Sequence, residues 1–298
     1  MPPALQHPAR RLALGRAGAL GLGALLGGCA LPADHAGPEA PRAAPLAKRP
    51  RVAWVFSSGG PRGFVHVGVI KALDRLGLAP DLIVGASVGA LVGTLRAGGL
   101  DAARIEALAL SLGLHELIRL QPGGPAWLGA GGLPDWLDAQ LPSPRLQELP
   151  LPMVCVAQRL DDGQIVGFTA GHAGLAVQAA AAVVGELAPV RIHGRLYGDA
   201  DPISPLPVRL ARALGAQRVL AVDASAHEDR APPAAARFRA GDLAKRARTA
   251  PDAAAADLLL HPDFGYWVNL SRAFRERAIA AGEQATLAQA EALRALHA

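Results

Sequence analysis

The stretch WVFSSGGPRGFVHVG, residues 54–68, places a glycine-rich turn between an apolar run and a segment with helical spacing. The apolar residues before the turn predict a buried strand, and the apolar residues that recur every three or four positions over 64–77 predict a helix. N–H groups at the start of a helix are unpaired, and the helix dipole adds partial positive charge there. The stretch therefore predicts a strand–turn–helix unit with an anion site in its loop.

The rest of the chain continues to alternate between strand-like and helix-like runs. Residues 80–87 (PDLIVGAS) and 217–225 (QRVLAVDAS) are short apolar runs that predict further buried strands. Such alternation favours an α/β fold with three layers, α/β/α, around a central and mostly parallel sheet. The other expected elements are helices at 88–99, 100–113, 175–185 and 269–296, a hairpin at 151–171, a Gly-, Pro- and Trp-rich segment at 119–144 and a mobile loop at 226–252.

The N-terminal residues have the pattern of a bacterial export signal. Residues 9–29 (ARRLALGRAGALGLGALLGGC) combine arginines, a short apolar stretch and small residues before Cys29. The ending LLGGC resembles the lipobox of bacterial lipoproteins, in which the cysteine becomes the lipidated first residue. We expect a lipoprotein signal peptide at 1–28, an Ala/Pro-rich tether at 29–50 and a folded domain at 51–298. A plain cleaved signal or an N-terminal anchor is the alternative.

The signal pattern predicts where the protein resides, and the charge and the cysteine content predict what it lacks. A lipid anchor on Cys29 would hold it in the bacterial cell envelope, at the periplasmic face of the outer membrane. The formal net charge of +5 falls to +2 without the three arginines of the signal, and no basic face with interleaved aromatic residues is evident, so we expect no nucleic-acid partner. Two cysteines, Cys29 and Cys155, are too few for a disulfide framework.

The second strand–helix junction carries a candidate nucleophile, Ser87. Residues 85–89 read GASVG and fit the pattern G-x-S-x-G, in which a sharp turn exposes a serine at the start of a helix. Gly85 and Gly89 leave out side chains that would clash where the strand and helix backbones approach. Five-residue matches also arise by chance in glycine-rich chains, so a simple strand-to-helix turn stays open as the alternative.

The glycine loop before this junction fits an oxyanion better than a nucleotide phosphate. Residues 57–63 (SSGGPRG) lack the Lys-Ser or Lys-Thr of a P-loop, and their glycines do not have the G-x-G-x-x-G spacing of a dinucleotide site. An oxyanion hole needs only neighbouring backbone N–H donors, and the consecutive glycines Gly59 and Gly60 bring such donors close to a substrate. The loop therefore favours ester cleavage over nucleotide binding.

A serine nucleophile needs a base, which is normally a histidine. His227 and His261 follow Asp199 in the chain order of an α/β-hydrolase triad, but His227 lies in the expected loop and His261 precedes a proline. A Ser–Asp–His triad built on one of them stays open. No His or Cys cluster with metal-site spacing accompanies Asp199, so no metal and no other cofactor is expected.

Three motifs in order resemble the patatin-like phospholipase family: SSGGPRG at 57–63, GASVGAL at 85–91 and LYGDADPISPLPV at 196–208. That family has a G-G-G-x-R-G oxyanion loop, a G-x-S-x-G elbow and a D-G-G or D-G-A motif followed by N-P-x-P. It uses a Ser–Asp dyad without a histidine. The resemblance extends over nearly everything from Arg51 to the C-terminus and implies a hydrolase of ester lipids, of phospholipase or lysophospholipase type.

The resemblance also implies roles for single residues. Ser87 is then the nucleophile and Asp199 the base, and the oxyanion loop contains Gly59, Gly60, Arg62 and Gly63. The chain departs from the family pattern at Ser58, which replaces the first loop glycine, at Pro61, which has no N–H, and at Ala200 and Asp201, where the family usually has glycines. A catalytically inactive lipid- or protein-binding lipoprotein is therefore the alternative from another functional class.

Overall fold

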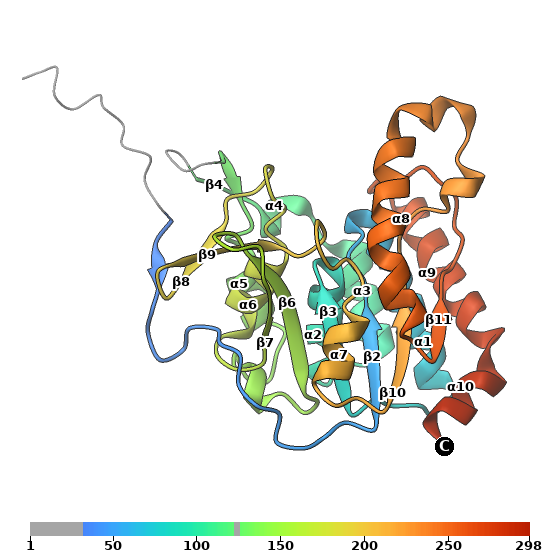
Figure 1. The fold of residues 1–298 in the computed structure, drawn as a ribbon, viewed down its shortest axis with the longest axis horizontal. Helices are drawn as coiled ribbons and strands as arrows, with labels where there is room; N and C mark the ends of the chain where they lie inside the picture. The colour runs from blue at the N-terminus through green and yellow to red at the C-terminus, as the bar shows by residue number, and fades with distance from the viewer. Residues whose placement is uncertain (1–31, 122–125) are drawn as a thin grey trace, which may run out of the picture.

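The apolar run that opens the glycine-loop unit forms a strand of five residues, all of them buried. This strand belongs to a nine-stranded sheet in the computed structural model, which describes residues 32–121 and 126–298 (Figure 1). The strands are β1 (Asp34–His35), β2 (Val52–Phe56), β3 (Leu82–Ala86), β6 (Met153–Arg159), β7 (Ile165–Phe168), β8 (Val190–Ile192), β9 (Arg195–Asp199), β10 (Arg218–Val222) and β11 (Leu258–Leu260).

The centre of the sheet is parallel and one side of it is antiparallel. The strand order is β1-β8-β9-β6-β3-β2-β10-β11, and β7 pairs with β6 off this path. In the run β6-β3-β2-β10-β11, each strand is parallel to the next. β9 is antiparallel to both β6 and β8, and the predicted hairpin at 151–171 forms as β6 and β7. The predicted α/β fold with a mostly parallel sheet is confirmed.

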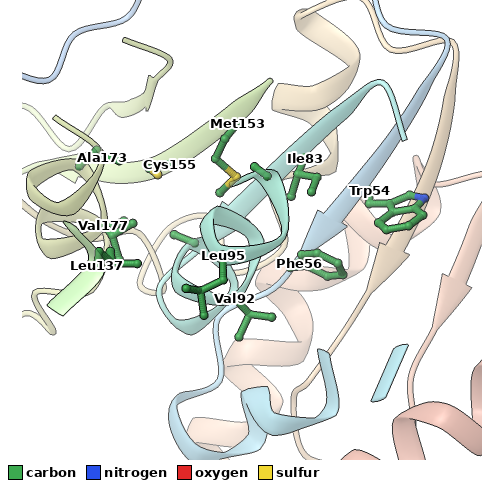
Figure 2. Packing of buried hydrophobic residues seen from close by; sticks show 14 of the residues in the cluster. Trp54, Phe56, Ile83, Val92, Leu95, Leu137, Met153, Cys155, Ala173 and Val177 are labelled. Atoms are coloured by element: carbon green, nitrogen blue, oxygen red, sulfur yellow. The ribbon is translucent and has the colours of Figure 1, made fainter. Parts of the chain in front are cut away.

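Helices cover both faces of this sheet, because successive residues of a strand point to opposite sides. Trp54 and Phe56 of β2 face one layer, and Ala53 and Val55 face the other. Figure 2 shows the first of these layers, in which Val92 and Leu95 pack over the sheet. The helices are α1 (Phe64–Arg75), α2 (Val88–Ala97), α3 (Ala102–Ser111), α4 (Leu114–Leu117), α5 (Leu133–Asp138), α6 (Ala173–Ala180), α7 (Val208–Ala213), α8 (Arg239–Ala254), α9 (Arg272–Leu287) and α10 (Ala290–His297).

Strands β3 and β9 follow one another along the same edge of β6. Val156 of β6 pairs with Ala86 on one side and with a β7 residue on the other. The next residue, Ala157, keeps β7 as a partner but now pairs with Asp199 on the side that β3 has left. The end of β9 therefore lies just beyond the end of β3, which brings Asp199 next to Ser87.

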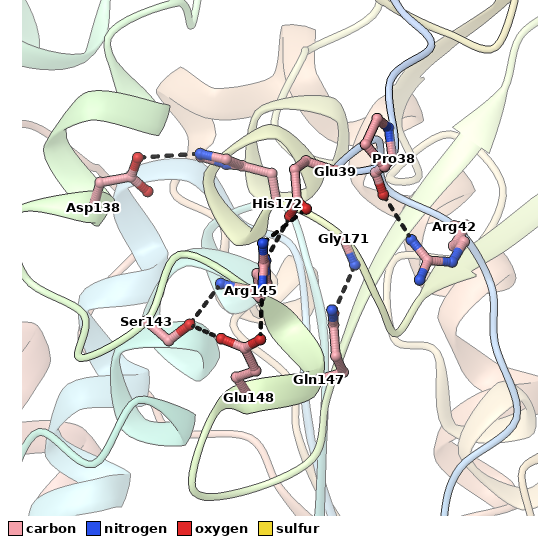
Figure 3. A network of polar contacts seen from close by, with 10 residues as sticks. All are labelled: Pro38, Glu39, Arg42, Asp138, Ser143, Arg145, Gln147, Glu148, Gly171 and His172. Atoms are coloured by element: carbon pink, nitrogen blue, oxygen red, sulfur yellow. Dashed lines mark hydrogen bonds and ion pairs between the residues drawn. The ribbon is translucent and has the colours of Figure 1, made fainter.

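The folded domain begins earlier than the predicted boundary at Arg51. Asp34 and His35 of β1 pair with β8, and Ala40 is buried. Figure 3 shows Glu39 held by Arg145 through two hydrogen bonds of 2.7 and 2.9 Å. Residues 34–50 are therefore packed against the domain and are not a free tether, because they bind partners more than 100 residues away in the sequence.

The predicted mobile loop at 226–252 is wrong. The 16-residue helix α8 fills most of it, preceded by the short 3₁₀ helices η3 (Glu228–Arg230) and η4 (Pro233–Phe238). Alanine, arginine and lysine are good helix formers, but the apolar positions of α8 are alanines and Leu243, and only Thr249 and Asp252 are buried. A helix that is hydrophilic overall in this way resembles a charged loop in composition.

The C-terminal helix and the segment at 119–144 also differ in detail from expectation. The single predicted helix at 269–296 is divided into α9 and α10 by Ala288 and Gln289. The segment at 119–144 contains α5 and a small separate sheet of β4 (Arg119–Leu120) and β5 (Leu128–Gly129). Two further 3₁₀ helices are η1 (Gly60–Gly63) and η2 (Leu146–Glu148).

The predicted signal peptide at 1–28 and the lipidation site Cys29 lie outside the described residues. Across 32–121 and 126–298, none of the helices combines the length and the apolar character needed to cross a bilayer.

Candidate active site

Ser87 occupies a strained turn between β3 and α2. Its backbone angles are φ 54° and ψ −126°, a region that residues other than glycine rarely adopt. A Cβ atom on Gly85 would lie 2.4 Å from the Gly89 oxygen, and one on Gly89 would lie 2.4 Å from the Phe56 oxygen. Both glycines are thus required by backbone contact, and the turn holds Ser87 at the positive end of the α2 dipole.

The glycine loop lies directly against this turn. A Cβ atom on Gly63 would come within 2.2 Å of Val88 Cγ1, so the loop and the start of α2 are in contact. Gly60 has a φ of +53° and open space around it, and both Gly59 and Gly60 line the cavity that contains Ser87. Among the described residues, no hydrogen-bond acceptor takes the N–H of Gly59 or Gly60. Two adjacent donors without a partner among these residues therefore lie at the cavity that contains Ser87.

Ser58 does not add a third backbone donor. Its N–H donates to the Pro205 oxygen at 2.9 Å, so the first position of the loop is used to attach the loop to the segment after β9. Its hydroxyl hydrogen-bonds to the carboxylate of Asp201.

The side chain of Arg62 binds protein carbonyls rather than the cavity. Its guanidinium donates to the carbonyl oxygens of Gly265 and Tyr266 and lies over the rings of Phe264 and Tyr266. Burial lowers the pKa of Arg62, and Asp242 and Tyr266 oppose that effect. The arginine of the predicted oxyanion loop therefore holds the 264–266 segment in place.

Asp199 ends β9 and is buried, with 2% of its surface exposed. The N–H of Asp201 donates to its Oδ1 at 2.9 Å. Burial raises the pKa of Asp199 to about 6, while the nearby Ser87 hydroxyl and the hydrogen bond from the Asp201 N–H act to lower it. A carboxylate with this pKa is ionised at neutral pH and is a stronger base than an ordinary aspartate.

The histidines of the open triad hypothesis are engaged elsewhere. The rings of His227 and His261 stack with centroids 3.8 Å apart, and each bonds to a carbonyl oxygen near β10 or β11. No hydrogen bond of the described residues joins either histidine to Ser87 or Asp199. The geometry thus brings together Ser87 and Asp199 without a histidine.

Two other side chains, those of Cys155 and Asp223, do not line the cavity. Cys155 is buried, and burial raises the pKa of its thiol to about 12. The Asp223 carboxylate accepts the N–H of Ser225. Among residues 32–121 and 126–298, no three His, Cys, Asp or Glu side chains gather in a way that would bind a metal ion.

A cavity of about 750 Å³ opens above Ser87. We call the glycine loop at 58–63 and the elbow at 85–89 the floor of this cavity. We call those residues between 238 and 268 that line the cavity its outer wall. The floor contributes polar groups, and the outer wall is largely apolar and exposed, with Phe238 at 42%, Trp267 at 48% and Val268 at 41%. The outer-wall residues are Phe238, Asp242, Lys245, Tyr266, Trp267 and Val268.

The outer wall is the part of the site that the sequence did not predict. Lys245 and Asp242 come from α8, which projects beyond the ends of the strands (orange in Figure 1), and Tyr266 comes from the loop before α9. Ser225, which follows β10, also lines the cavity. Its position could have been predicted from the sequence, because Ser225 ends a predicted strand and the carboxyl ends of neighbouring parallel strands meet at one edge of a sheet.

An α/β sheet with a serine elbow, an oxyanion loop and a buried aspartate defines a class of serine hydrolase folds, and a comparison with known proteins identifies the family. The profile of the patatin-like phospholipase family matches residues 54–212, more than half of the chain. The chain therefore belongs to the patatin-like phospholipase family.

Individual relatives agree with this assignment. An uncharacterized NTE family protein of Mycobacterium tuberculosis is 35% identical over 183 residues, which is 60% of this chain and 50% of that protein. The lysophospholipase NTE1 of Saccharomyces cerevisiae is 27% identical over 187 residues, 61% of this chain and 11% of the yeast protein. The chain thus corresponds to half or less of the length of these relatives. The crystal structure of VipD from Legionella pneumophila has the same fold, with a TM-score of 0.55 and 15% identity over 83% of this chain and 67% of VipD.

Proposed function

We propose that this chain is a serine acyl hydrolase of ester lipids that uses Ser87 as nucleophile and Asp199 as base. The observation that carries the proposal is the juxtaposition of the strained Ser87, the buried Asp199 and the unpartnered N–H groups of Gly59 and Gly60 in one cavity. Family membership and the name of the yeast relative, a lysophospholipase, support the lipid ester as the substrate class.

The first half of the reaction would form an acyl-enzyme. Ser87 Oγ attacks the ester carbonyl carbon while Asp199 takes the hydroxyl proton. The carbonyl oxygen becomes an oxyanion that accepts hydrogen bonds from the N–H groups of Gly59 and Gly60. The tetrahedral intermediate then collapses, the bond to the alcohol oxygen breaks, and Asp199 returns the proton to the leaving alcohol.

The second half would release the acid. Water gives a proton to Asp199 as its oxygen attacks the acyl carbon, and a second oxyanion forms in the same loop. Collapse breaks the bond to Ser87 Oγ, which recovers the proton. A pKa of about 6 suits Asp199 to both roles, because the group is ionised before attack and still basic enough to accept a proton.

The apolar outer wall supports a substrate with an acyl chain. Phe238, Trp267 and Val268 offer apolar surface at the cavity, where a long acyl chain of a phospholipid or lysophospholipid would be removed from water. We further propose that Cys29 is lipidated and holds the enzyme at the periplasmic face of the outer membrane. The lipobox-like sequence before Cys29 supports this part of the proposal.

Active-site labelling tests the dyad. Purified protein is incubated with a fluorophosphonate probe, the labelled peptide is mapped by mass spectrometry, and hydrolysis of a lysophospholipid is measured in parallel. We expect label on Ser87, none in Ser87→Ala, and loss of hydrolysis in Ser87→Ala and Asp199→Asn. Activity that disappears in His227→Ala or His261→Ala would favour the triad, and a wild type without label or turnover would favour the inactive binding protein.

The anchor needs a separate test. Full-length protein produced in a Gram-negative host with radiolabelled palmitate is expected to take up label and to fractionate with the outer membrane. Cys29→Ser should lose the label. Equal palmitate labelling of both proteins would contradict the lipoprotein assignment.

A further inference from the structure

Three polar side chains from three separate segments meet at the cavity. Ser58 comes from the loop after β2, Asp201 from the turn after β9, and Lys245 from α8, and all three line the cavity. The Ser58 hydroxyl hydrogen-bonds to Asp201 Oδ1. Lys245 Nζ lies 2.6 Å from the same Oδ1 and 3.3 Å from Ser58 Oγ. One carboxylate oxygen thus joins the oxyanion loop, the turn behind the base and the outer wall.

Two of these residues are departures from the family pattern, and they contact each other. Ser58 stands where the first loop glycine is usual, and Asp201 stands two residues after the base, where a glycine or alanine is usual. A glycine at either position would have no side chain with which to make this contact. The departures therefore form a matched pair in this chain, rather than two independent disturbances of the site.

The cluster contains a charge that needs compensation. Burial alone would raise the pKa of Asp201, but attraction to Lys245, with hydrogen bonds from Lys245 and Ser58, outweighs burial and holds the pKa below its usual value. Asp201 is therefore a carboxylate at neutral pH, two residues from the carboxylate of Asp199. Lys245 neutralises a negative charge that would otherwise face the base.

We propose that Ser58, Asp201 and Lys245 form a bridge that fixes the oxyanion loop relative to the turn carrying Asp199, with Lys245 as a positioning residue for the Ser87–Asp199 pair. The bridge rests on the proposed function of that pair. It connects α8, whose other residues are mostly exposed, to the reacting groups through Asp201, whose N–H donates to Asp199.

The charged groups around the pair define what the bridge does to the base. Asp199 is faced by the negative charge of Asp201 and the positive charge of Lys245, and Asp201 is also attracted by Arg248 of α8. Loss of Lys245 would leave Asp201 less compensated, so Asp199 would ionise at a higher pH. Loss of the Asp201 charge would have the opposite effect, because Lys245 would then act on Asp199 alone.

Two other charged side chains that line the cavity have partners of their own. Arg62 donates to the carbonyl oxygens of Gly265 and Tyr266. Asp242 accepts the Tyr266 hydroxyl at 2.7 Å. Both remain in place when Lys245 or Asp201 is changed, so they act as a constant background in the test.

The test is the pH dependence of kcat/KM for a soluble short-chain ester, measured on Lys245→Met, Asp201→Asn and the double variant. We expect the acid limb to move up by about half a pH unit in Lys245→Met and down by a similar amount in Asp201→Asn. The double variant should return close to the wild-type limb. Opposite shifts distinguish a charged bridge from a merely structural contact, which would lower activity without moving the limb.

Arg246→Met supplies the matched control. Arg246 is the next residue of α8 and pairs at 2.7 Å with Glu228, away from the cavity lining. We expect no shift of the limb. Acid limbs that stay fixed in Lys245→Met and Asp201→Asn, or that move in the same direction, would overturn the bridge. The proposed function is tested separately, by the loss of hydrolysis in Ser87→Ala. If Lys245→Met does not fold, Asp201→Asn decides alone, since a limb that fails to move down contradicts the proposal.

Discussion

The floor and the outer wall of the cavity are held by different kinds of contact. The floor is fixed by backbone against backbone at the elbow, where Gly85 and Gly89 leave no room for a Cβ atom, and a Cβ atom on Gly63 would collide with the Val88 side chain. The outer wall is fixed by side chains, such as Arg62 bound to Tyr266 and Lys245 bound to Asp201. Backbone contacts tolerate no added atom, whereas side-chain contacts can be exchanged one at a time.

The largest effect is expected from an added methyl group in the floor. In Gly89→Ala the new Cβ would lie 2.4 Å from the Phe56 oxygen, a backbone atom that cannot turn away. We expect a loss of roughly 3 kcal/mol or more in the free energy of unfolding, together with loss of hydrolysis. Urea unfolding followed by circular dichroism measures the first effect. A variant with wild-type stability would show that the elbow relaxes easily.

Asp199→Asn should separate activity from stability. The amide cannot accept the Ser87 proton, so kcat/KM should fall by about 10³-fold and the acid limb near pH 6 should disappear. In the wild type, the pKa of Asp199 is higher in the folded state than in the unfolded chain. The wild type therefore loses stability as the pH rises from 3.8 to about 6.

The same variant should therefore be more stable than wild type above that window. Because Asn carries no charge to bury, we expect a gain of about 1–2 kcal/mol at pH 7.5 and little gain at pH 4. Thermal unfolding at the two pH values measures the difference. An equal change at both would contradict burial as the cause of the raised pKa.

The apolar side chains of the outer wall should control chain length rather than chemistry. Trp267→Ala removes an exposed ring from the cavity and should lower kcat/KM for a long-chain lysophospholipid by about 10-fold, while a two-carbon ester is hydrolysed nearly as before. Trp127→Ala is the matched control, because Trp127 is 75% exposed but does not line the cavity. Equal losses on both substrates would contradict an acyl-binding wall.

The smallest effect is expected from a second glycine-to-alanine substitution, made in α8, the helix that carries part of the outer wall. Gly241 lies in α8, and a Cβ atom added there would have nothing within 4 Å, so Gly241→Ala meets no neighbour. Alanine is the better helix former by about 1 kcal/mol, and we expect a gain of up to that amount with unchanged activity. Destabilisation comparable to that of Gly89→Ala would remove the contrast between the two regions.

The floor could be predicted from sequence because its geometry is encoded locally. The elbow glycines stand within two residues of Ser87, and the loop glycines stand together at 59, 60 and 63. The failed nucleotide patterns already directed the loop toward an oxyanion. The place of Asp199 was implied only by family resemblance. Its physical cause, the succession of β3 and β9 along one edge of β6, depends on strand pairing between distant segments.

The outer wall and the N-terminal segment could not be predicted in this way. Lys245 lies on a helix that is hydrophilic overall, and its partner Asp201 is 44 residues away. Glu39 and Ala40 belong to a Pro-rich stretch with no periodicity, yet they pack on the domain through contacts such as that with Arg145. Both regions are stabilised by single long-range contacts, which leave no repeating pattern in the sequence.

The outer wall lies after the part of the chain that matches the family. The matched residues, 54–212, contain Ser87 and Asp199 and the whole floor, while the wall residues lie between 238 and 268. The apolar side chains of the wall, Phe238, Trp267 and Val268, can therefore be exchanged without altering Ser87, Asp199 or Lys245. On the proposed function, such an arrangement would let the Ser87–Asp199 pair serve different acyl chains through changes confined to one downstream segment.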